Sequence, residues 1–357
     1  MSQSPSSSST NATLQSNESQ ELITQRKQDH INAILQDSEI ERKQSGFEKI
    51  RLQHRALPEL DFTKVDTTTE FLGKKLSFPL LISSMTGGNA GNLADINCHL
   101  AEAAETCQVA MAVGSQRTML ENPKAANSFQ LRQYAPNVPL IANLGAVQLN
   151  YGVTTSQVQS LIDVLEADAL YLHLNPLQEL IQPEGDHNFA KLADKIADLN
   201  QQLDVPIILK EVGSGMSPQD IELGLQAGIK WFDLAGRGGT SWSRIEAHRS
   251  ENHLGYLFQD WGLTTVEALQ LSQHYQEQAS FIASGGIRNG VEMAKAVIMG
   301  AQIFGVAAPL LKPAMQSSDA VIQKITELKQ EYTTTQFLLG IEKTAQLIGN
   351  KNLVLAG

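Results

Sequence analysis

The stretch that decides the fold is residues 206–240, with the sequence PIILKEVGSGMSPQDIELGLQAGIKWFDLAGRGGT. It starts with a short apolar segment, Pro206–Val212, and a second apolar segment follows at Trp231–Leu234. The amphipathic stretch between them, Ser217–Ala227, carries Pro218 where a helix start favours proline. A strand, a helix and a second strand in this order indicate a βαβ unit of a parallel sheet.

The same alternation extends in both directions along the chain. Eight short apolar segments are predicted strands: Phe78–Ser83, Ala110–Val113, Leu140–Ala142, Ala169–Leu174, Pro206–Val212, Trp231–Leu234, Phe281–Ala283 and Ile303–Val306. The stretches between most of them are predicted helices: Leu93–Thr106, Ser156–Glu166, Ala190–Asn200, Ser217–Ala227, Thr264–Gln273 and Val291–Met299. Eight strands joined by helices favour an α/β fold closed into a single (β/α)8 TIM barrel. An open doubly wound sheet is the alternative that a strand count alone leaves open.

The amino-terminal part of the chain has a different composition. Residues 1–20 are rich in serine, asparagine and glutamine, and they have too little apolar surface to order themselves. They also lack the apolar region of a secretory signal. The charged stretch Gln25–Arg42 is a predicted helical extension. The sequence therefore predicts a disordered tail over residues 1–20 and one barrel domain over residues 21–357.

Composition excludes several kinds of partner. The 357 residues carry a formal net charge of −11, which argues against affinity for nucleic acid or an anionic membrane. No apolar run reaches the roughly 18 residues of a membrane span. The two cysteines, Cys98 and Cys107, are too few for a disulfide framework and lack zinc-site spacing. We therefore expect a cytoplasmic protein with a small-molecule ligand.

Polar and glycine-rich segments follow the predicted strands, at the end of the barrel where reactive groups gather. They are Ser83-Ser84-Met85-Thr86-Gly87-Gly88, Gly114-Ser115-Gln116-Arg117, Asn143-Leu144-Gly145, His173-Leu174-Asn175-Pro176-Leu177-Gln178-Glu179, Lys210-Glu211-Val212-Gly213, Gly236-Arg237-Gly238-Gly239-Thr240-Ser241-Trp242, Ser284-Gly285-Gly286-Ile287-Arg288 and Ala307-Ala308-Pro309. Each alone has an ordinary structural interpretation, such as a glycine turn or a first-turn helix acid. Their coincidence at all eight strand ends indicates a functional site.

The segments after the seventh and eighth strands predict a phosphate site. Glycines at Gly285 and Gly286 let backbone N–H groups approach an anion, and the start of the helix that follows adds a favourable dipole. Lys210, on the fifth strand, would favour the anionic reduced ring of a flavin. These features predict FMN across the mouth of the barrel, with Asn143 and Thr240 as hydrogen-bond partners.

In this order, the segments resemble the type 2, FMN-dependent isopentenyl-diphosphate delta-isomerases. Arg26-Lys27 and His30 belong to the same pattern, and the resemblance covers roughly residues 25–310. Its most specific parts are Asn-Pro-Leu-Gln-Glu at residues 175–179 and Gly-Gly-Thr-Ser-Trp at residues 238–242. The family's reaction moves the double bond of isopentenyl diphosphate to form dimethylallyl diphosphate in isoprenoid biosynthesis.

The resemblance implies a role for each matching residue. FMN would contact Ser83, Ser84, Met85, Thr86, Ser115, Asn143, Lys210, Thr240, Gly285, Gly286, Ile287, Arg288, Ala307 and Ala308. The substrate would contact Arg26, Lys27, His30, Ser115, Gln116, Arg117, His173, Asn175 and Gln178. Gln178, His173 and Lys210 would serve catalysis, and Glu179 would ligate Mg²⁺. The family also implies NADPH as reductant and a homo-oligomer, an octamer or tetramer.

Two other functions compete with this interpretation. An FMN-dependent oxidoreductase resembling the α-hydroxy-acid oxidases would need a histidine base near the sixth strand. The segment at residues 236–242 has no histidine, although His248 and His253 follow it. A barrel that only binds a phosphorylated ligand is the second alternative, and it has less need of His173 and Lys210. For the isomerase, the hypothesis is that N5 of reduced flavin exchanges the protons and that Gln178 orients the substrate or relays through water.

Overall fold

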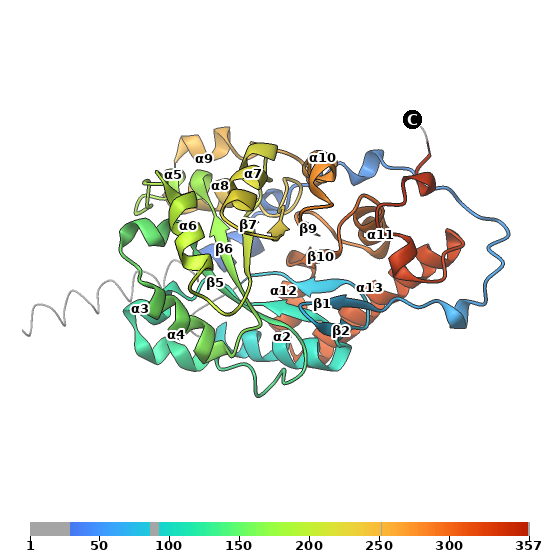
Figure 1. Ribbon diagram of the computed structural model, residues 1–357, viewed down its shortest axis with the longest axis horizontal. Helices are drawn as coiled ribbons and strands as arrows, with labels where there is room; N and C mark the ends of the chain where they lie inside the picture. The colour runs from blue at the N-terminus through green and yellow to red at the C-terminus, as the bar shows by residue number, and fades with distance from the viewer. Residues whose placement is uncertain (1–28, 86–92, 251, 356–357) are drawn as a thin grey trace, which may run out of the picture.

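The chain forms a closed barrel of eight parallel strands, in the order β10-β3-β4-β5-β6-β7-β8-β9 (Figure 1). The computed structural model describes residues 29–85, 93–250 and 252–355. The barrel strands are β3 (Leu80–Ile82), β4 (Ala110–Ala112), β5 (Leu140–Gly145), β6 (Ala169–Leu174), β7 (Ile207–Glu211), β8 (Trp231–Asp233), β9 (Ser280–Ala283) and β10 (Ile303–Val306). All eight predicted strands are therefore confirmed, and the open sheet is excluded because β10 pairs with β3.

The predicted crossover helices are also present. They are α2 (Leu93–Cys107), α4 (Thr155–Leu165), α6 (Leu192–Asn200), α7 (Pro218–Gln226), α10 (Thr265–Ser272) and α11 (Gly290–Ile298). Three of them begin at a capping box, in which Thr154, Ser217 and Thr264 each accept a hydrogen bond from the backbone three residues later. Local capping thus accounts for where these helices start.

Other helices had no predicted range. Short ones lie after the strands, namely α3 (Arg117–Glu121), α5 (Pro176–Ile181), α8 (Trp242–Ser250), α9 (His253–Leu257) and α12 (Ala308–Ala314). The long helix α13 (Ser318–Leu338) packs against α2 and α11. None of the helices in the described ranges is long and apolar enough to cross a membrane.

The amino end of the barrel is closed by a hairpin that the sequence analysis did not predict. Strands β1 (Thr69–Phe71) and β2 (Lys74–Leu76) are joined by Leu72 and Gly73, which both have positive φ, at 52° and 73°. Phe71 and Leu76 are buried inside the barrel. The other members of this inner cluster are Leu81, Ala110, Ala112, Ile141, Ala169, Tyr171, Ile208, Ile282 and Ile303.

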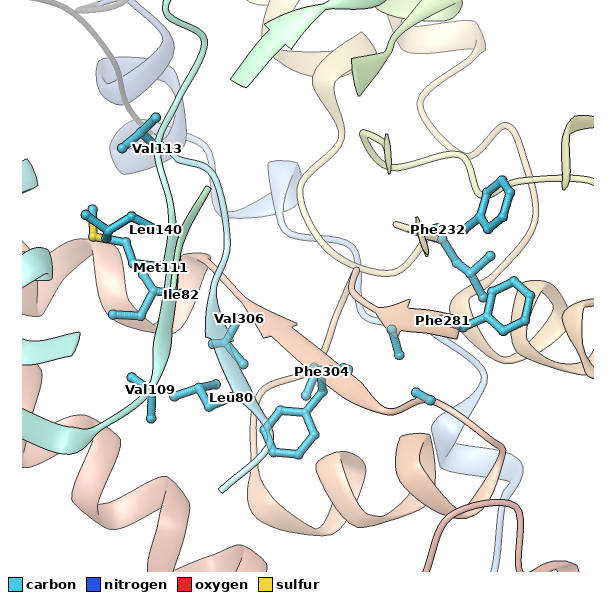
Figure 2. Close-up of a cluster of buried hydrophobic side chains, with 14 of the residues drawn as sticks. Leu80, Ile82, Val109, Met111, Val113, Leu140, Phe232, Phe281, Phe304 and Val306 are labelled. Atoms are coloured by element: carbon cyan, nitrogen blue, oxygen red, sulfur yellow. The ribbon is translucent and has the colours of Figure 1, made fainter. Parts of the chain in front are cut away.

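A second and larger apolar layer lies between the barrel and its helices (Figure 2). Neighbouring residues of one strand divide between the two layers: Leu80 and Ile82 belong to the outer layer and Leu81 to the inner one. This alternation follows from the two-residue period of a strand. The apolar side chains thus hold the barrel from both sides and leave its carboxyl end to polar groups.

The amino-terminal extension is shorter as a helix than predicted. The predicted helix over Gln25–Arg42 is helical only at residues 29–36 in the part that the structure describes. Asp37 then caps a short 3-10 turn and accepts hydrogen bonds from Arg244 Nε at 2.6 Å and from His248 Nε2 at 2.5 Å. These contacts to α8 hold the extension against the rim of the barrel. Residues 1–28, which include the predicted tail, lie outside the described residues.

Candidate active site

One pocket lies at the carboxyl ends of the barrel strands and brings most of the predicted site residues together. Those that line it are His30, Ser83, Ser84, Met85, Ser115, Arg117, Asn143, His173, Asn175, Gln178, Glu179, Lys210, Thr240, Gly285, Gly286, Ile287, Arg288, Ala307 and Ala308. Three predicted residues, Arg26, Lys27 and Thr86, lie outside the described residues.

Gln116 does not line this pocket, contrary to its predicted substrate contact. Its side chain is fully buried, and its amide nitrogen donates to the carbonyl of Leu161 at 2.9 Å. Its amide oxygen accepts from the backbone N–H of Asn143 at 3.0 Å. Both ends of the amide are therefore occupied, and the side chain of Gln116 fixes the end of β5.

The loop after β9 has the backbone geometry of an anion site. Gly285 and Gly286 have φ values of 99° and 76°, which disfavour any residue with a side chain. A Cβ at Gly285 would lie 2.0 Å from the carbonyl oxygen of Gly236. Within the described chain, the N–H groups of Gly285, Gly286 and Ile287 donate to no other protein group. Backbone donors that face a pocket without partners fit a phosphate.

The start of α11 contributes less to this cradle than predicted. Asn289 accepts from the N–H of Glu292, Glu292 accepts from the N–H of Arg288, and Glu331 accepts from the N–H of Gly290. Two carboxylates already offset the helix dipole there. The pocket instead contains the start of α12, at Ala307 and Ala308, where no side chain caps the helix.

Lys210 is held beneath the pocket by a buried acid. Its Nζ donates to Asp233 Oδ2 at 2.9 Å and to Ser284 Oγ at 3.3 Å. Lys210 is 6% exposed and Asp233 is fully buried. Residues of β7, β8 and the loop after β9 therefore meet at one ammonium group, which faces the pocket.

His173 is a neutral hydrogen-bond partner here. Its Nδ1 lies 2.8 Å from Asn143 Oδ1, while Asn143 Nδ2 donates to Ser84 Oγ and to the carbonyl of Val113. Because Asn143 Oδ1 is an acceptor, we assign the proton to Nδ1 and leave Nε2 as an acceptor. Burial and the charge of Lys210 lower the pKa of His173 to about 4. His173 therefore contributes no positive charge toward a diphosphate at neutral pH.

Asn175 and Glu179 form a pair with spare acceptor capacity. Glu179 Oε1 accepts from Asn175 Nδ2 at 2.8 Å, and Oε2 accepts from the N–H of Asp186 at 2.7 Å. Asn175 Oδ1 is buried and has no partner in the part of the chain that is described. An unpartnered amide oxygen beside a carboxylate fits a hard cation or its bound water. No group of three or more metal-binding side chains occurs among the described residues.

Gln178 belongs to a polar network centred on Glu246 of α8. Glu246 Oε1 accepts from Gln178 Nε2 at 3.0 Å and lies 3.0 Å from His30 Nε2, and Oε2 accepts from Arg249 at 2.5 Å. Burial alone would raise the pKa of Glu246, but the hydrogen bonds to His30 and Gln178 and the charge of Arg249 lower it to about 2. The network therefore holds a carboxylate next to Gln178.

Residues 41 and 42 of the extension reach the glycine loops. Glu41 accepts hydrogen bonds from Thr240 Oγ1 and from the Arg288 guanidinium. That guanidinium also donates to the backbone carbonyls of Arg42 and Gly238. Arg288 and Thr240, both predicted to contact FMN, thus also tie the extension to the barrel.

Sequence reasoning missed four acids around the pocket: Glu41, Asp186, Asp233 and Glu246. Asp186 accepts from Arg117 and Gln148, both at 2.7 Å. Asp233 offered a signal, because an acid within a buried apolar strand needs a partner. Glu246 offered none, since it lies in a polar helix 68 residues from Gln178.

The comparisons first define a class of protein. A family profile described as FMN-dependent dehydrogenase matches residues 20–138 and 152–354. The fold is similar to a flavocytochrome b2 variant with pyruvate bound, at TM-score 0.65 and 18% identity, covering 88% of this chain and 78% of that one. It is also similar to a mandelate oxidase variant, at TM-score 0.58 and 17% identity, covering 85% and 88%. These low identities show the fold alone.

Curated relatives define the family within that class. The isopentenyl-diphosphate delta-isomerase of Hydrogenovibrio crunogenus is 66% identical over 337 residues, covering 93% of this chain and 98% of that protein. The isopentenyl-diphosphate delta-isomerase of Paracoccus zeaxanthinifaciens is 55% identical over 340 residues, covering 93% and 97%. That of Rickettsia prowazekii is 46% identical over 325 residues, covering 90% and 95%. The chain therefore belongs to the family of FMN-dependent isopentenyl-diphosphate delta-isomerases.

Proposed function

We propose that this chain converts isopentenyl diphosphate to dimethylallyl diphosphate, with reduced FMN as acid–base cofactor and Mg²⁺ on the diphosphate. The observation that carries the proposal is one pocket that combines three features: glycine-loop N–H groups without a partner among the described residues, buried Lys210, and the Asn175–Glu179 pair. The N–H groups suit the phosphate of FMN, and Lys210 suits its ring. The Asn175–Glu179 pair suits a metal-bound diphosphate.

The reaction needs one proton added to the alkene and another removed two carbons away. Reduced FMN, when bound, supplies a group that can give and take these protons without net oxidation. Gln178 cannot give a proton at neutral pH, but its amide is held by Glu246 and Asn175, at 3.0 and 3.3 Å. We propose that Gln178 orients the reacting carbons of the substrate. Alternatively, it orients a water that lies between these carbons and Glu246.

The diphosphate would bind at a distance from the reacting carbons. Glu179 and Asn175 Oδ1 would hold Mg²⁺ or its waters, and Arg117, kept in place by Asp186 at 2.7 Å, would add positive charge. Arg26, Lys27, His30 and Ser115 are proposed to complete this subsite. Binding energy from the diphosphate can then position the alkene without acting on it directly.

Neither histidine that follows the sixth barrel strand lies where the oxidoreductase alternative would need its base. His248 is hydrogen-bonded to Asp37 at the rim, and neither His248 nor His253 is among the residues that line the pocket. His173 does line it, but burial and the charge of Lys210 lower its pKa to about 4, which makes it a weak base at neutral pH. The names of the curated relatives likewise favour the isomerase.

Three further properties belong to the proposal. NADPH would keep the flavin reduced, the protein would act in the cytoplasm, and the active form would be a homo-oligomer. Exposed apolar side chains support association between copies: Leu180, Leu254, Leu257 and Trp261 are between 49% and 64% exposed.

The test is an anaerobic assay of the purified protein with FMN, NADPH or dithionite, Mg²⁺ and isopentenyl diphosphate. We expect dimethylallyl diphosphate to form only with reduced flavin, and reductant not to be consumed in proportion to product. A protein that binds FMN but forms no product would refute the isomerase. Flavin reduction by a hydroxy acid would then support the oxidoreductase.

A further inference from the structure

Asp233 is an acid at the end of β8 whose carboxylate is completely occupied by donors. Oδ2 accepts from the Tyr171 hydroxyl and from Lys210 Nζ, both at 2.9 Å. Oδ1 accepts from Ser284 Oγ at 2.5 Å and from the N–H of Ala235 at 3.3 Å. Because each oxygen accepts two hydrogen bonds, the carboxylate is fixed in place.

The geometry leaves one N–H of Lys210 for the pocket. An ammonium group has three N–H donors, and two of them go to Asp233 and Ser284 below it. The ring of Tyr171 also lies on this side, with its centroid 5.6 Å from Nζ. Lys210 itself lines the pocket, so its third donor faces the space proposed for the flavin.

Asp233 also supplies the charge that a buried ammonium needs. A buried lysine without a negative partner tends to lose its proton. Burial and the neighbouring Asp233 raise the pKa of Tyr171 well above its usual value, so the Tyr171 hydroxyl remains a neutral donor. Tyr171 therefore adds no charge to this cluster, and the Asp233 carboxylate is the acid in direct contact with the Lys210 ammonium.

We propose that Asp233 is a positioning residue that keeps Lys210 charged and aims one of its N–H groups at the ring of reduced FMN. The inference rests on the FMN site of the proposed function. Asp233 lies beneath Lys210 and does not line the pocket, so it touches neither the proposed cofactor site nor the proposed substrate site. Its effect must therefore pass through Lys210.

The test uses Asp233→Asn in the FMN-loaded protein, reduced anaerobically and titrated with pH. The absorbance of reduced flavin distinguishes its neutral ring from its anionic ring. We expect Lys210 to lose its proton in this variant and the midpoint of this titration to rise by roughly 1 to 2 pH units, because the anionic ring then lacks the opposite charge of Lys210. An unchanged or lowered midpoint in Asp233→Asn would overturn the proposal.

Asp168→Asn is the matched control. Asp168 is also a carboxylate paired with two cations, Lys74 at 2.6 Å and Arg132 at 2.8 Å, but it lies at the amino end of the barrel. We expect the wild-type midpoint in this variant even if its stability falls. A rise equal to that of Asp233→Asn would show a general loss of structure and would overturn the positioning role.

A second comparison decides the matter if Asp233→Asn does not fold. Lys210→Met leaves Asp233 buried without its cation, whereas Lys210→Met with Asp233→Asn removes both charges. If Asp233 acts through Lys210, the added Asp233→Asn will not raise the midpoint above that of Lys210→Met. A further rise would overturn the proposal. Wild-type protein that binds no FMN would instead overturn the proposed function together with this inference.

Discussion

The two ends of the barrel each contain a lysine–aspartate pair, but in opposite surroundings. At the amino end, Lys74 Nζ lies 2.6 Å from Asp168, with the two side chains 30% and 21% exposed. At the carboxyl end, Lys210 Nζ lies 2.9 Å from Asp233, with the side chains 8% and 0% exposed. The first pair joins the hairpin to the barrel, and the second lies under the pocket.

The difference separates groups that stabilise the fold from groups that serve the site. A partly exposed pair contributes little to stability, and the amino end depends on Phe71 and Leu76 inside the barrel. A buried pair loses hydration energy that apolar residues would not lose. We propose that the pair is present at the mouth because its cation is offered to a ligand.

The largest expected effect is at the amino end. Phe71→Ala should lower the free energy of unfolding by about 3–5 kcal/mol, because it leaves a cavity under the barrel. Phe71 is 1% exposed and contacts Trp231 edge-on, with ring centroids 5.0 Å apart. Denaturant titration measures the change. Leu57→Ala is the control, since Leu57 is 70% exposed. Equal losses of stability in the two variants would contradict the view that Phe71 stabilises the amino end of the barrel from inside.

The next effect is at the mouth and concerns catalysis. Glu179→Gln should lower turnover by about 100-fold or more. Even the loss of a group that only supports a metal ligand typically lowers metal affinity or activity by about 10- to 100-fold. The variant should also need more Mg²⁺ for half-maximal activity, while its stability changes little. Glu184→Gln is the control, because Glu184 is an exposed acid on the same rim, paired with Arg249 at 3.0 Å. Wild-type Mg²⁺ dependence in Glu179→Gln would remove Glu179 from the metal site.

A smaller effect concerns acid stability at the mouth. His173 has a pKa near 4 in the folded chain against 6.5 ordinarily, so the unfolded chain binds its proton first as pH falls. The free energy of unfolding therefore falls as the pH is lowered from 6.5 to 4. His173 should account for a decrease of about 2 kcal/mol between pH 7 and pH 5.

Denaturant titrations at the two pH values measure this dependence. His173→Gln should lose less stability than the wild type over the same range. His274→Gln, at an exposed position, should keep the wild-type dependence. Identical losses in His173→Gln and the wild type would show that His173 is not the group responsible.

The smallest effect is expected for the exposed pair. Lys74→Met should change the free energy of unfolding by at most about 1 kcal/mol, as measured for exposed ion pairs. The difference from the wild type should shrink at high salt, which screens exposed charges. Unfolding in low and high salt checks both statements. A loss as large as that of Phe71→Ala would show that the pair itself holds the hairpin.

The sequence predicted the fold well where local pattern and function coincide. Strand β6 has the predicted bounds, Ala169–Leu174, because its apolar run is followed directly by the polar segment of the site. The hairpin β1–β2 was missed because each strand has three residues, only one of which is buried. Two-residue periodicity needs longer strands to be recognised.

The gathering of most candidate site residues at one pocket was predictable for the same reason, whereas the side-chain direction of Gln116 was not. In a barrel, residues at the ends of different strands meet regardless of their separation, so Asn143, His173 and Lys210 could be grouped from sequence. Gln116 was grouped with them, but its side chain turns inward to Leu161 and the N–H of Asn143. Strand position gives the location of a residue and leaves the direction of its side chain open.

The sequence by itself determined the barrel, the end at which the site lies and the family of the chain. These follow from local periodicity, capping and short motifs, which need no knowledge of distant contacts. Only the tertiary structure decided which acids hold the site together. Glu246 meets His30 across 216 residues, and Asp233 meets Tyr171 across 62. Such contacts depend on how the strands and the extension come together in space, and no local pattern encodes them.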